Sequence, residues 1–324
     1  MLLRRFVSAC ALFFLFVTGC GSPASNSSKS RGVLITAQPN ALRVEIDGQL
    51  FTEYHYKDAN RPYYYPVIGP ENLRMTRDWP MASPPDEEHD HPHHRSLWYA
   101  HGDVNGVNFW TDVTPFGKIV HDKFIEIKSG RDVGVIQSTD NWVAPDGSIV
   151  CTDERTMRIY NHPGMRLFDF DITIHASHGA VTFGDTKEGT MAIRLAETMK
   201  LKKPGQGHIV NSEGVRDDQT WGKRADWCDY SGPVDGKTVG VAIFDNPANP
   251  LHPTSWHVRD YGLFAVNPFG LHDFEKKPAH SGDFTIPAGK SATFRYRFYL
   301  HDGDEKQAHV AEMYADYARE AEHK

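Results

Sequence analysis

The sequence predicts a mainly β protein, a large antiparallel β-sandwich followed by one C-terminal helix. Short runs rich in β-branched and aromatic residues recur along the chain, and several of them alternate apolar with polar side chains. Turn sequences such as residues 145–147 (Pro-Asp-Gly) and 234–236 (Val-Asp-Gly) separate these runs, because they supply the φ angles that tight reversals need. Only residues 304–322 carry helical spacing, and no solenoid or propeller repeat is visible.

The first residues have the pattern of a targeting segment. Arg4 and Arg5 precede an apolar run over residues 6–17, which is too short for a permanent membrane span. Cys20 follows Val-Thr-Gly, as in a bacterial lipoprotein signal, so we expect a signal peptide over residues 1–19 and a lipid on Cys20. An ordinary signal peptide with an unrelated cysteine is the alternative.

The composition then predicts a tether and a single domain. Residues 20–32 are rich in serine, asparagine and lysine, which favours a flexible linker, and residues 33–324 form the domain. We expect a lipid anchor in the bacterial cell envelope, with the domain in the periplasm or at the cell surface. The outer membrane is preferred, because no aspartate follows Cys20 as in an inner-membrane retention signal. No apolar stretch of about 20 residues follows the signal, which predicts no transmembrane span in the mature protein.

The expected strands follow one another through the domain. They cover residues 42–46, 50–56, 63–68, 124–128, 134–143, 149–160 and 167–175. In the last of these, Phe168, Phe170, Ile172 and Ile174 share one face, which predicts a sheet with one buried face. The same alternation recurs over residues 294–300.

The helix expected over residues 304–322 closes the chain. Val310, Met313 and Tyr317 mark its apolar stripe, and Asp304 stands where a cap of the first turn is expected. A helix with one apolar stripe packs against a sheet through that stripe, so we expect it on the outside of the sandwich.

Charge and cysteine content exclude several classes of protein. The chain has 35 basic and 42 acidic residues, a net charge of -7, which argues against nucleic acid as a partner. Cys151 and Cys228 lack the C-x-x-C spacing of a redox or zinc site. A disulfide between them and two separate buried thiols are both open.

The residues that carry chemistry concentrate between residues 86 and 110. Five histidines lie there, His89, His91, His93, His94 and His101. Imidazole exchanges protons near neutral pH and also binds metals, so the cluster suits proton transfer, substrate hydrogen bonding or a metal site. Part of the cluster is expected to be structural, because buried histidines often bond to backbone carbonyls.

A metal site is the alternative that needs a further ligand from a distant part of the chain. In an extended segment His91 and His93 project to one side, and they would hold a divalent metal only with a distant third ligand. The sequence shows no regular spacing for that ligand. We therefore predict no cofactor and keep a divalent metal as an alternative.

Several long motifs resemble a known family. The stretch from His91 to Trp110, His-Pro-His-His-Arg-Ser-Leu-Trp-Tyr-Ala-His-Gly-Asp-Val-Asn-Gly-Val-Asn-Phe-Trp, resembles the signature of the bacterial family labelled PmoA-like, a family of unknown function. Residues 185–194, 221–227, 256–262 and 267–270 extend the resemblance in the same order. Ser96 departs from the pattern, which has glycine after Arg95. The label implies methane oxygenation, but the chain lacks the transmembrane helices of membrane methane monooxygenases.

The resemblance implies a saccharide substrate and a galactose mutarotase-like sandwich. Members of this kind resemble partners of sugar oxidoreductases and sugar isomerases. In the mutarotase-like fold, histidines and a glutamate move protons on a sugar, and this step is an analogy from fold to function.

These arguments select two groups of residues. The candidate acid and base groups are His94, His101 and Glu188, with Asp103 orienting a histidine. The expected substrate-binding residues are His93, Arg95, Trp98, Asn105, Lys187, Trp221, Lys223, Arg224, His257 and Arg259.

The resulting hypothesis is a carbohydrate-active enzyme of the hydrolase or lyase type. It acts on a glycoside or a modified glycoside through histidine and carboxylate acid-base chemistry. A hydrolase needs two carboxylates at a suitable separation, and the sequence does not identify that pair. The alternatives are a lipid-anchored sugar-binding protein without turnover and a metal-dependent sugar enzyme.

Overall fold

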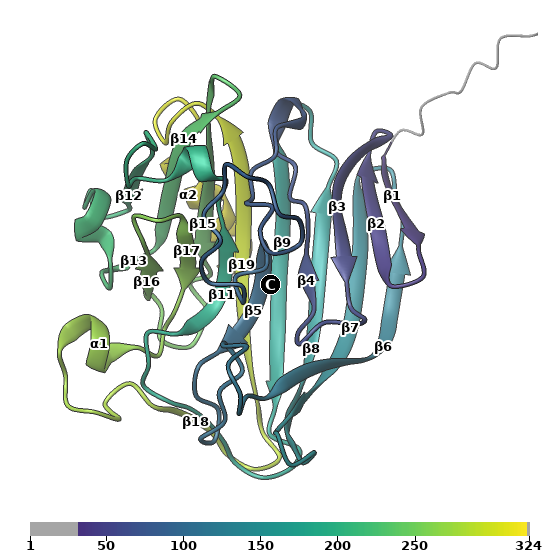
Figure 1. Cartoon of the computed structure of the whole chain (residues 1–324), viewed down its shortest axis with the longest axis vertical. Helices are drawn as coiled ribbons and strands as arrows, with labels where there is room; N and C mark the ends of the chain where they lie inside the picture. Colours follow the sequence, from purple (N-terminus) through teal and green to yellow (C-terminus); the bar gives the residue numbers. More distant parts are fainter. Residues whose placement is uncertain (1–31, 323–324) are drawn as a thin grey trace, which may run out of the picture.

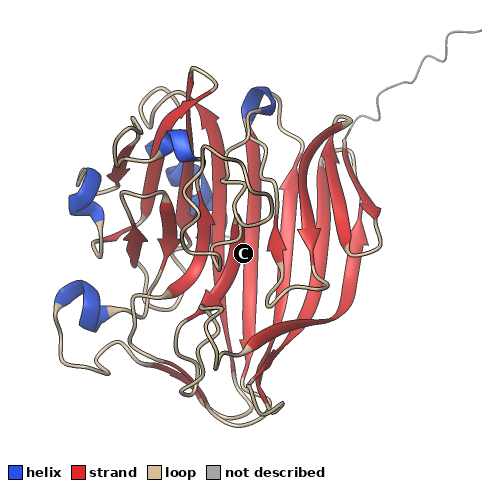
Figure 2. Ribbon diagram, in the orientation of Figure 1, coloured by secondary structure: helices blue, strands red, loops and turns tan. Residues whose placement is uncertain are grey.

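A computed structural model describes residues 32–322, and the expected lipid site Cys20 lies outside them. Two large antiparallel sheets dominate the molecule (Figures 1 and 2). The first has nine strands, in the spatial order β1 (Val33–Ala37), β2 (Ala41–Ile46), β3 (Gln49–His55), β4 (Tyr63–Tyr64), β5 (Leu97–His101), β11 (Gly189–Arg194), β17 (Leu263–Val266), β16 (Thr254–Val258) and β13 (Arg224–Ala225). The expected mainly β sandwich with a C-terminal helix is confirmed.

The second sheet has eight strands and provides the other layer. Its order is β12 (His208–Asn211), β14 (Trp227–Val234), β15 (Lys237–Asp245), β19 (Ser291–Asp302), β9 (Arg166–His175), β8 (Ile149–Tyr160), β7 (Val133–Val143) and β6 (Lys118–Lys128). A short ribbon pairs β10 (Val181–Phe183) with β18 (Phe284–Ile286). The helices are α1 (Leu271–Glu275) and α2 (Val310–Glu322), with short 3-10 turns at Pro70–Asn72, Glu197–Met199 and Asp217–Thr220.

The core lies between the two sheets because both present an apolar face to it. The alternation expected over β9 is present, and Phe168 and Phe170 are buried toward the nine-stranded sheet. Phe168 lies 5.8 Å from Phe51 of β3 and stacks at 4.7 Å on Phe298 of the neighbouring β19. Each such buried ring contributes about 1.5–3 kcal/mol of burial free energy, so these contacts hold the layers together.

The C-terminal helix packs on the outer face of the eight-stranded sheet. Tyr314 and Tyr317 of α2 contact Phe244 of β15, with ring centroids 5.6 and 6.0 Å apart. The helix begins at Val310, whereas the sequence pattern placed its start at residue 304. The Asp304 carboxylate instead caps a separate turn by accepting the backbone N–H groups of residues 306 and 307.

Two further findings complete the fold. Cys151 and Cys228 are both buried and free, so the two thiols are separate. Within residues 32–322, no helix is both long enough and apolar enough to cross a lipid bilayer.

A charged cluster is sealed inside the sandwich on β7 and β8. Arg155 donates to Asp153 through Nε and Nη2, at 2.9 and 2.8 Å, and its Nε lies 3.0 Å from Asp140. The three side chains are 3% exposed or less. Burial alone lowers the pKa of Arg155, but the charges of Asp153 and Asp140 outweigh it and raise that pKa. Arg155 therefore neutralises carboxylates that have no access to water.

Arg155→Met is expected to lower the free energy of unfolding by about 3–5 kcal/mol, because it removes the arginine that pairs with two buried carboxylates and leaves only the His121 ring, 3.5 Å from Asp140, beside them. Urea denaturation followed by fluorescence measures this change. Arg158→Met is the matched control on the same strand, since its ion pair with Asp171 is partly exposed and contributes about 1 kcal/mol or less. Equal losses in the two variants would contradict the assigned role of Arg155.

Candidate functional site

A cavity of about 540 Å³ opens on the outer face of the nine-stranded sheet. Four segments that are far apart in the sequence line it. They contribute His91, His93 and His94; Asn108, Trp110 and Thr111; Lys187 and Glu188; and His257, Arg259 and Tyr261. The loop before β5 lies in front of the sheet and brings the histidines to the other three segments (Figure 1).

The register of the sheet explains which side chains reach this face. Trp98 of β5 pairs with Ala192 of β11, which stands in line with Ala265 of β17 and His257 of β16. Directly paired residues share a face, so Trp98 and His257 project to the same side as the two alanines between them. Small side chains in the middle of this row leave space above the sheet for the cavity.

The loop is fixed to the sheet by one carboxylate shared between two buried arginines. Asp90 accepts hydrogen bonds from Arg77 and from Arg194 of β11, the latter at 2.9 Å, and both guanidinium groups are fully buried. The His91 ring also donates through Nδ1 to Asp90, at 2.7 Å. Burial pushes the pKa of Asp90 up, but these hydrogen bonds and positive charges outweigh it and hold the pKa well below its usual range.

His94 belongs to the same loop, and its ring is held in the neutral form. Its Nδ1 accepts a hydrogen bond from Arg194 at 3.2 Å, and the ring stacks on Trp98 at 5.2 Å. Arginine only donates, so the hydrogen of His94 is on Nε2. Burial, followed by the charges of His93 and Arg194, lowers the pKa of His94 well below its ordinary value. His94 therefore offers the cavity an N–H donor and carries no charge.

His257 repeats this arrangement on the opposite side of the cavity. Its Nδ1 accepts the indole N–H of Trp221 at 3.1 Å, and an indole also only donates. Burial, with the charges of Arg259 and Lys187, lowers the pKa of His257 to about 3. The hydrogen is again on Nε2, so the cavity has two neutral imidazole donors.

Glu188 is the carboxylate of the cavity wall. It precedes β11, and the Asp273 carboxylate of α1 fixes this segment by accepting the Lys187 backbone N–H at 2.8 Å. The nearest cation to the Glu188 carboxylate is the Lys187 Nζ, 4.0 Å away, and among residues 32–322 no group hydrogen-bonds to it. Burial raises the pKa of Glu188, and the Lys187 charge offsets only part of this rise. Glu188 is therefore a carboxylate with raised basicity, and its oxygens accept no hydrogen bond from the described residues.

The remaining histidines stack against one another without converging on a common point. His91 lies between His94 and Tyr261, with ring centroids 4.7 and 5.1 Å away. His93 packs edge-on against His94, and burial together with Arg61 lowers the pKa of His93 to about 4. In the described part of the chain no group of three or more histidine, cysteine, aspartate or glutamate side chains is arranged to hold a metal.

Six of the fourteen residues that the sequence selected meet at this cavity. His93, His94, Lys187, Glu188, His257 and Arg259 line it. Trp98 lies beneath His94, and Trp221 lines an adjoining hollow that shares Arg259 with the cavity. Arg77 and Asp90 were missed, because a single arginine or aspartate gives no distinctive signal in one sequence; Arg194 and Tyr261 lay inside quoted motifs but were not selected.

The structure places His101 and Asp103 away from the cavity. His101 points into the sandwich, because three positions separate it from Trp98 and an odd spacing reverses the face of a strand. Its Nε2 bonds to the Gly184 carbonyl at 2.8 Å. Asp103 accepts the Gly106 backbone N–H at 2.8 Å and bonds to no histidine among the described residues.

The four other selected residues do not line the cavity either. Arg95 stands 3.8 Å from the Asp112 carboxylate, and Asn105 bonds to the backbone of residues 180 and 182. Lys223 is exposed, and Arg224 donates to the carbonyl of residue 251. These positions lie in loops or at the sheet edge, where sequence spacing says little about direction.

Ser96, which departs from the quoted pattern, sits in a left-handed conformation. Its φ is 57°, and its buried hydroxyl donates to Thr76 at 2.9 Å. A glycine adopts this conformation without steric cost, which explains why a glycine suits the position. The hydroxyl bond to Thr76 compensates for that cost here.

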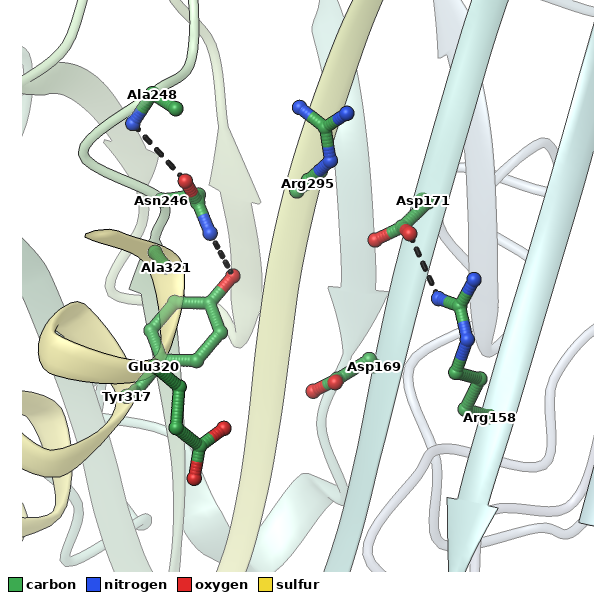
Figure 3. Close-up of a pocket in the computed structure, with 9 residues that line it drawn as sticks. All are labelled: Arg158, Asp169, Asp171, Asn246, Ala248, Arg295, Tyr317, Glu320 and Ala321. Atoms are coloured by element: carbon green, nitrogen blue, oxygen red, sulfur yellow. Dashed lines mark hydrogen bonds and ion pairs between the residues drawn. The ribbon is translucent and has the colours of Figure 1, made fainter. Parts of the chain in front are cut away.

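A second hollow, of about 480 Å³, lies between α2 and the outer face of β9 and β19 (Figure 3). Its carboxylates are already paired, as in the 2.7 Å bond from Arg158 to Asp171. Asn246 likewise donates to the Tyr317 hydroxyl at 3.0 Å. It contains no histidine, so it suits proton transfer less well than the cavity over β5 and β11.

Asp90→Asn is expected to lower the free energy of unfolding by about 3 kcal/mol at pH 7, because two buried guanidinium groups lose their counter-ion. The folded-state pKa of Asp90 lies below the ordinary 3.8, so this stabilisation is present above that pH and is lost as the pH falls below it. Urea denaturation between pH 3 and 7 measures the free energy of unfolding of both proteins. The difference between the unchanged protein and Asp90→Asn should become smaller toward pH 3. Asp86→Asn, at an exposed position of the same loop, is the control; a difference independent of pH would count against this role.

Comparison with solved structures gives only distant similarity. The chain is similar to an α-galactosidase from Lactobacillus brevis (11% identity, TM-score 0.44, covering 85% of this chain and 40% of that one). It is also similar to a galactose mutarotase related enzyme from Lactobacillus acidophilus (9% identity, TM-score 0.34, covering 84% and 98%). This chain thus spans about two fifths of the length of the α-galactosidase. No curated protein matches it.

The family comparison corrects the resemblance drawn from the motifs. The PmoA-like label is not supported, because the family that matches the chain carries no such label. Its description is "Family of unknown function (DUF6807)", and it matches residues 41–315, which include the histidine-rich loop and Arg259. The match covers most of the chain, and the protein therefore belongs to the family of unknown function DUF6807.

Proposed function

We propose that this protein is a carbohydrate-active enzyme of the lyase type. In this proposal Glu188 removes a proton from a sugar carbon next to a carbonyl group, and His94 and His257 donate hydrogen bonds to the oxygen that becomes negative. One observation carries the proposal. A carboxylate with raised pKa shares a cavity with two neutral imidazoles whose tautomers are fixed by partners that only donate.

The carboxylate has the properties of a general base. A base works best when its pKa approaches the working pH, and burial raises the pKa of Glu188 in that direction. The carboxylate has no hydrogen bond to another group among residues 32–322, so its lone pairs are available to a substrate. Asp90 lacks this freedom, because Arg77 and Arg194 bind it.

The histidines have the properties of electrophilic donors. A charge that develops on a carbonyl oxygen is stabilised by donors that are already oriented before the reaction. Neutral imidazole serves this purpose, and its weaker acidity matches that of an enolate better than imidazolium does. Arg194 and Trp221 orient the two rings from behind, so the Nε2 side of each ring is free for the substrate.

The size and lining of the cavity support a sugar. About 540 Å³ is within the range of small-molecule sites, which combine apolar walls with a few placed polar groups. Trp110 and Tyr261 provide aromatic surface, and Asn108 and Thr111 provide polar atoms.

The count of carboxylates favours elimination over hydrolysis. Glycoside hydrolysis requires a pair of carboxyl groups on either side of the scissile bond. Among the residues that line the cavity, Glu188 is the one carboxylate. Elimination needs one base and donors for the oxygen, which is the set of groups found here.

The proposed setting is the bacterial cell envelope. It depends on Arg4, Arg5 and Cys20, which have the order of a lipoprotein signal and lie outside the described residues. A lipid on Cys20 would hold the domain at a membrane surface, near saccharides that enter the envelope.

Glu188→Gln is expected to reduce turnover by a factor of about 10²–10⁴ while substrate binding is retained, because the amide cannot accept the proton. The protein is incubated in D₂O with a panel of glycans and 3-keto-glycosides, and mass spectrometry follows unsaturated products and deuterium uptake. Glu126→Gln, an exposed site on β6, is the matched control and should leave turnover unchanged.

Two outcomes would reject the enzyme proposal. Product formation that survives in Glu188→Gln would remove Glu188 as the base. Sugar binding without product in the unchanged protein would instead support the alternative, a sugar-binding protein without turnover.

The pH dependence of kcat/KM should show a single acid limb. Glu188 must be ionised to act as a base, so activity falls as the pH drops through its raised pKa, above the ordinary 4.5. The rate should be flat from about pH 7 to 8, since His257, with a pKa of about 3, stays neutral throughout. His257→Gln should lower kcat and leave the limb in place. A fall in kcat/KM near the ordinary histidine pKa that is absent in His257→Gln would show instead that a charged imidazole is required.

A further inference from the structure

Arg259 is a cation of the cavity wall without a carboxylate partner. Its guanidinium lies over the rings of Trp221 and Tyr261, 5.8 and 5.4 Å from their centroids. Within residues 32–322 it forms no ion pair, although Asp218 and Asp260 line the adjoining hollow beside it. The two rings hold the guanidinium between them, and its N–H groups form no hydrogen bond with the described residues. Such a guanidinium can donate two parallel hydrogen bonds to a planar anion with two oxygens, such as a carboxylate.

The surroundings of the cavity carry a surplus of positive charge. Two cations, Lys187 and Arg259, line the cavity with one carboxylate, Glu188. The charged side chains that bond directly to the lining residues are Arg61, Arg77, Arg194, Asp90 and Asp273. With Asp112, which accepts from Arg61 at 2.8 Å, five basic groups face four acidic ones, and the lining itself carries two cations and one carboxylate, in a chain whose net charge is -7.

The buried cations behind the wall are not fully compensated. Burial lowers the pKa of Arg61, and the charge of Asp112 restores only part of it. Burial and the charge of Arg77 lower the pKa of Arg194 in the same way. An anion in the cavity would reduce this repulsion, so the site gains from a negatively charged ligand.

We infer that the substrate of this site is a uronate, a sugar that carries a carboxylate, and that Arg259 binds this carboxylate with Lys187 as the second cation. The inference depends on the proposed lyase function, and it names the carbonyl group beside which the proton is removed. A neutral sugar would leave the stacked guanidinium without a partner in a positively charged cavity.

The step balances without any further reactant. Glu188 takes the hydrogen from C5 as a proton, and the electron pair of the C5–H bond moves into the carboxylate group. Arg259 and Lys187 hold that group while the two imidazole N–H groups face its developing charge. The pair then forms the C4–C5 double bond as the C4–O bond breaks. The proton passes from Glu188 to the departing oxygen, so nothing is oxidised or reduced overall.

The test compares methyl β-D-glucuronide with methyl β-D-glucoside, which differ in the carboxylate. Isothermal titration calorimetry on the full chain should give at least about tenfold tighter binding of the glucuronide. Arg259→Gln should remove this preference, and Arg259→Lys should restore part of it, because lysine keeps the charge and loses the planar fork. Arg158→Gln, in the second hollow, is the matched control and should leave the preference unchanged. Circular dichroism confirms that each variant is folded.

The outcomes separate this inference from the proposed function. Equal affinity for the two glycosides, or equal weakening of both by Arg259→Gln, would overturn the uronate assignment. The protein could instead turn over a neutral 3-keto-glycoside in a reaction that depends on Glu188, and show no preference for the glucuronide. That result would support the lyase function and reject the uronate as substrate. Binding of the glucuronide through Arg259, with no unsaturated product from a glucuronide that carries a second sugar on O4, would establish the carboxylate site and reject the lyase.

Discussion

The Asp90 carboxylate between Arg77 and Arg194 is the interaction on which the candidate site depends. It ties a long loop to β11 at a point where both arginines are fully buried. Arg194 then uses a second N–H to orient His94, and Asp90 orients His91. One buried ion cluster therefore sets the position of the loop and the protonation of a ring in the cavity. Buried charges need such a counter-ion to be tolerated, and the shared carboxylate offsets part of the charge of both arginines.

The same physical cause explains the chemistry of the cavity and its charge. Burial next to cations keeps His94 and His257 neutral, while burial of Glu188 raises its pKa. Burial is the main cause of this neutrality, and the charges of Arg194 beside His94 and of Arg259 beside His257 add to it. A base, two neutral donors and an unpaired arginine thus follow from one low-dielectric environment. Their combination suits a reaction in which negative charge develops on an oxygen of an already anionic sugar.

The sheets themselves decide where these groups meet. Strands β5, β11, β17 and β16 are neighbours in space although they come from three distant parts of the sequence, with β16 and β17 consecutive along the chain. Their register sets Trp98 and His257 on the outer face, with Ala192 and Ala265 between them. The face of each residue depends on its position along its own strand. His101, only three residues after Trp98, consequently points into the core.

The sequence by itself determined the mainly β class and much of the site. Alternation over β9 and turn residues such as those at 145–147 depend only on local spacing, and they predict strands correctly. The histidine-rich loop and the motifs around Glu188 and Arg259 also contained six residues that line the candidate cavity. Tertiary structure alone decided that Asp90 pairs with Arg194, that Trp221 fixes His257 and that Arg259 has no acidic partner. These contacts join residues about 36 to 104 positions apart, and burial, which sets their protonation, is a property of the folded chain and not of any local pattern.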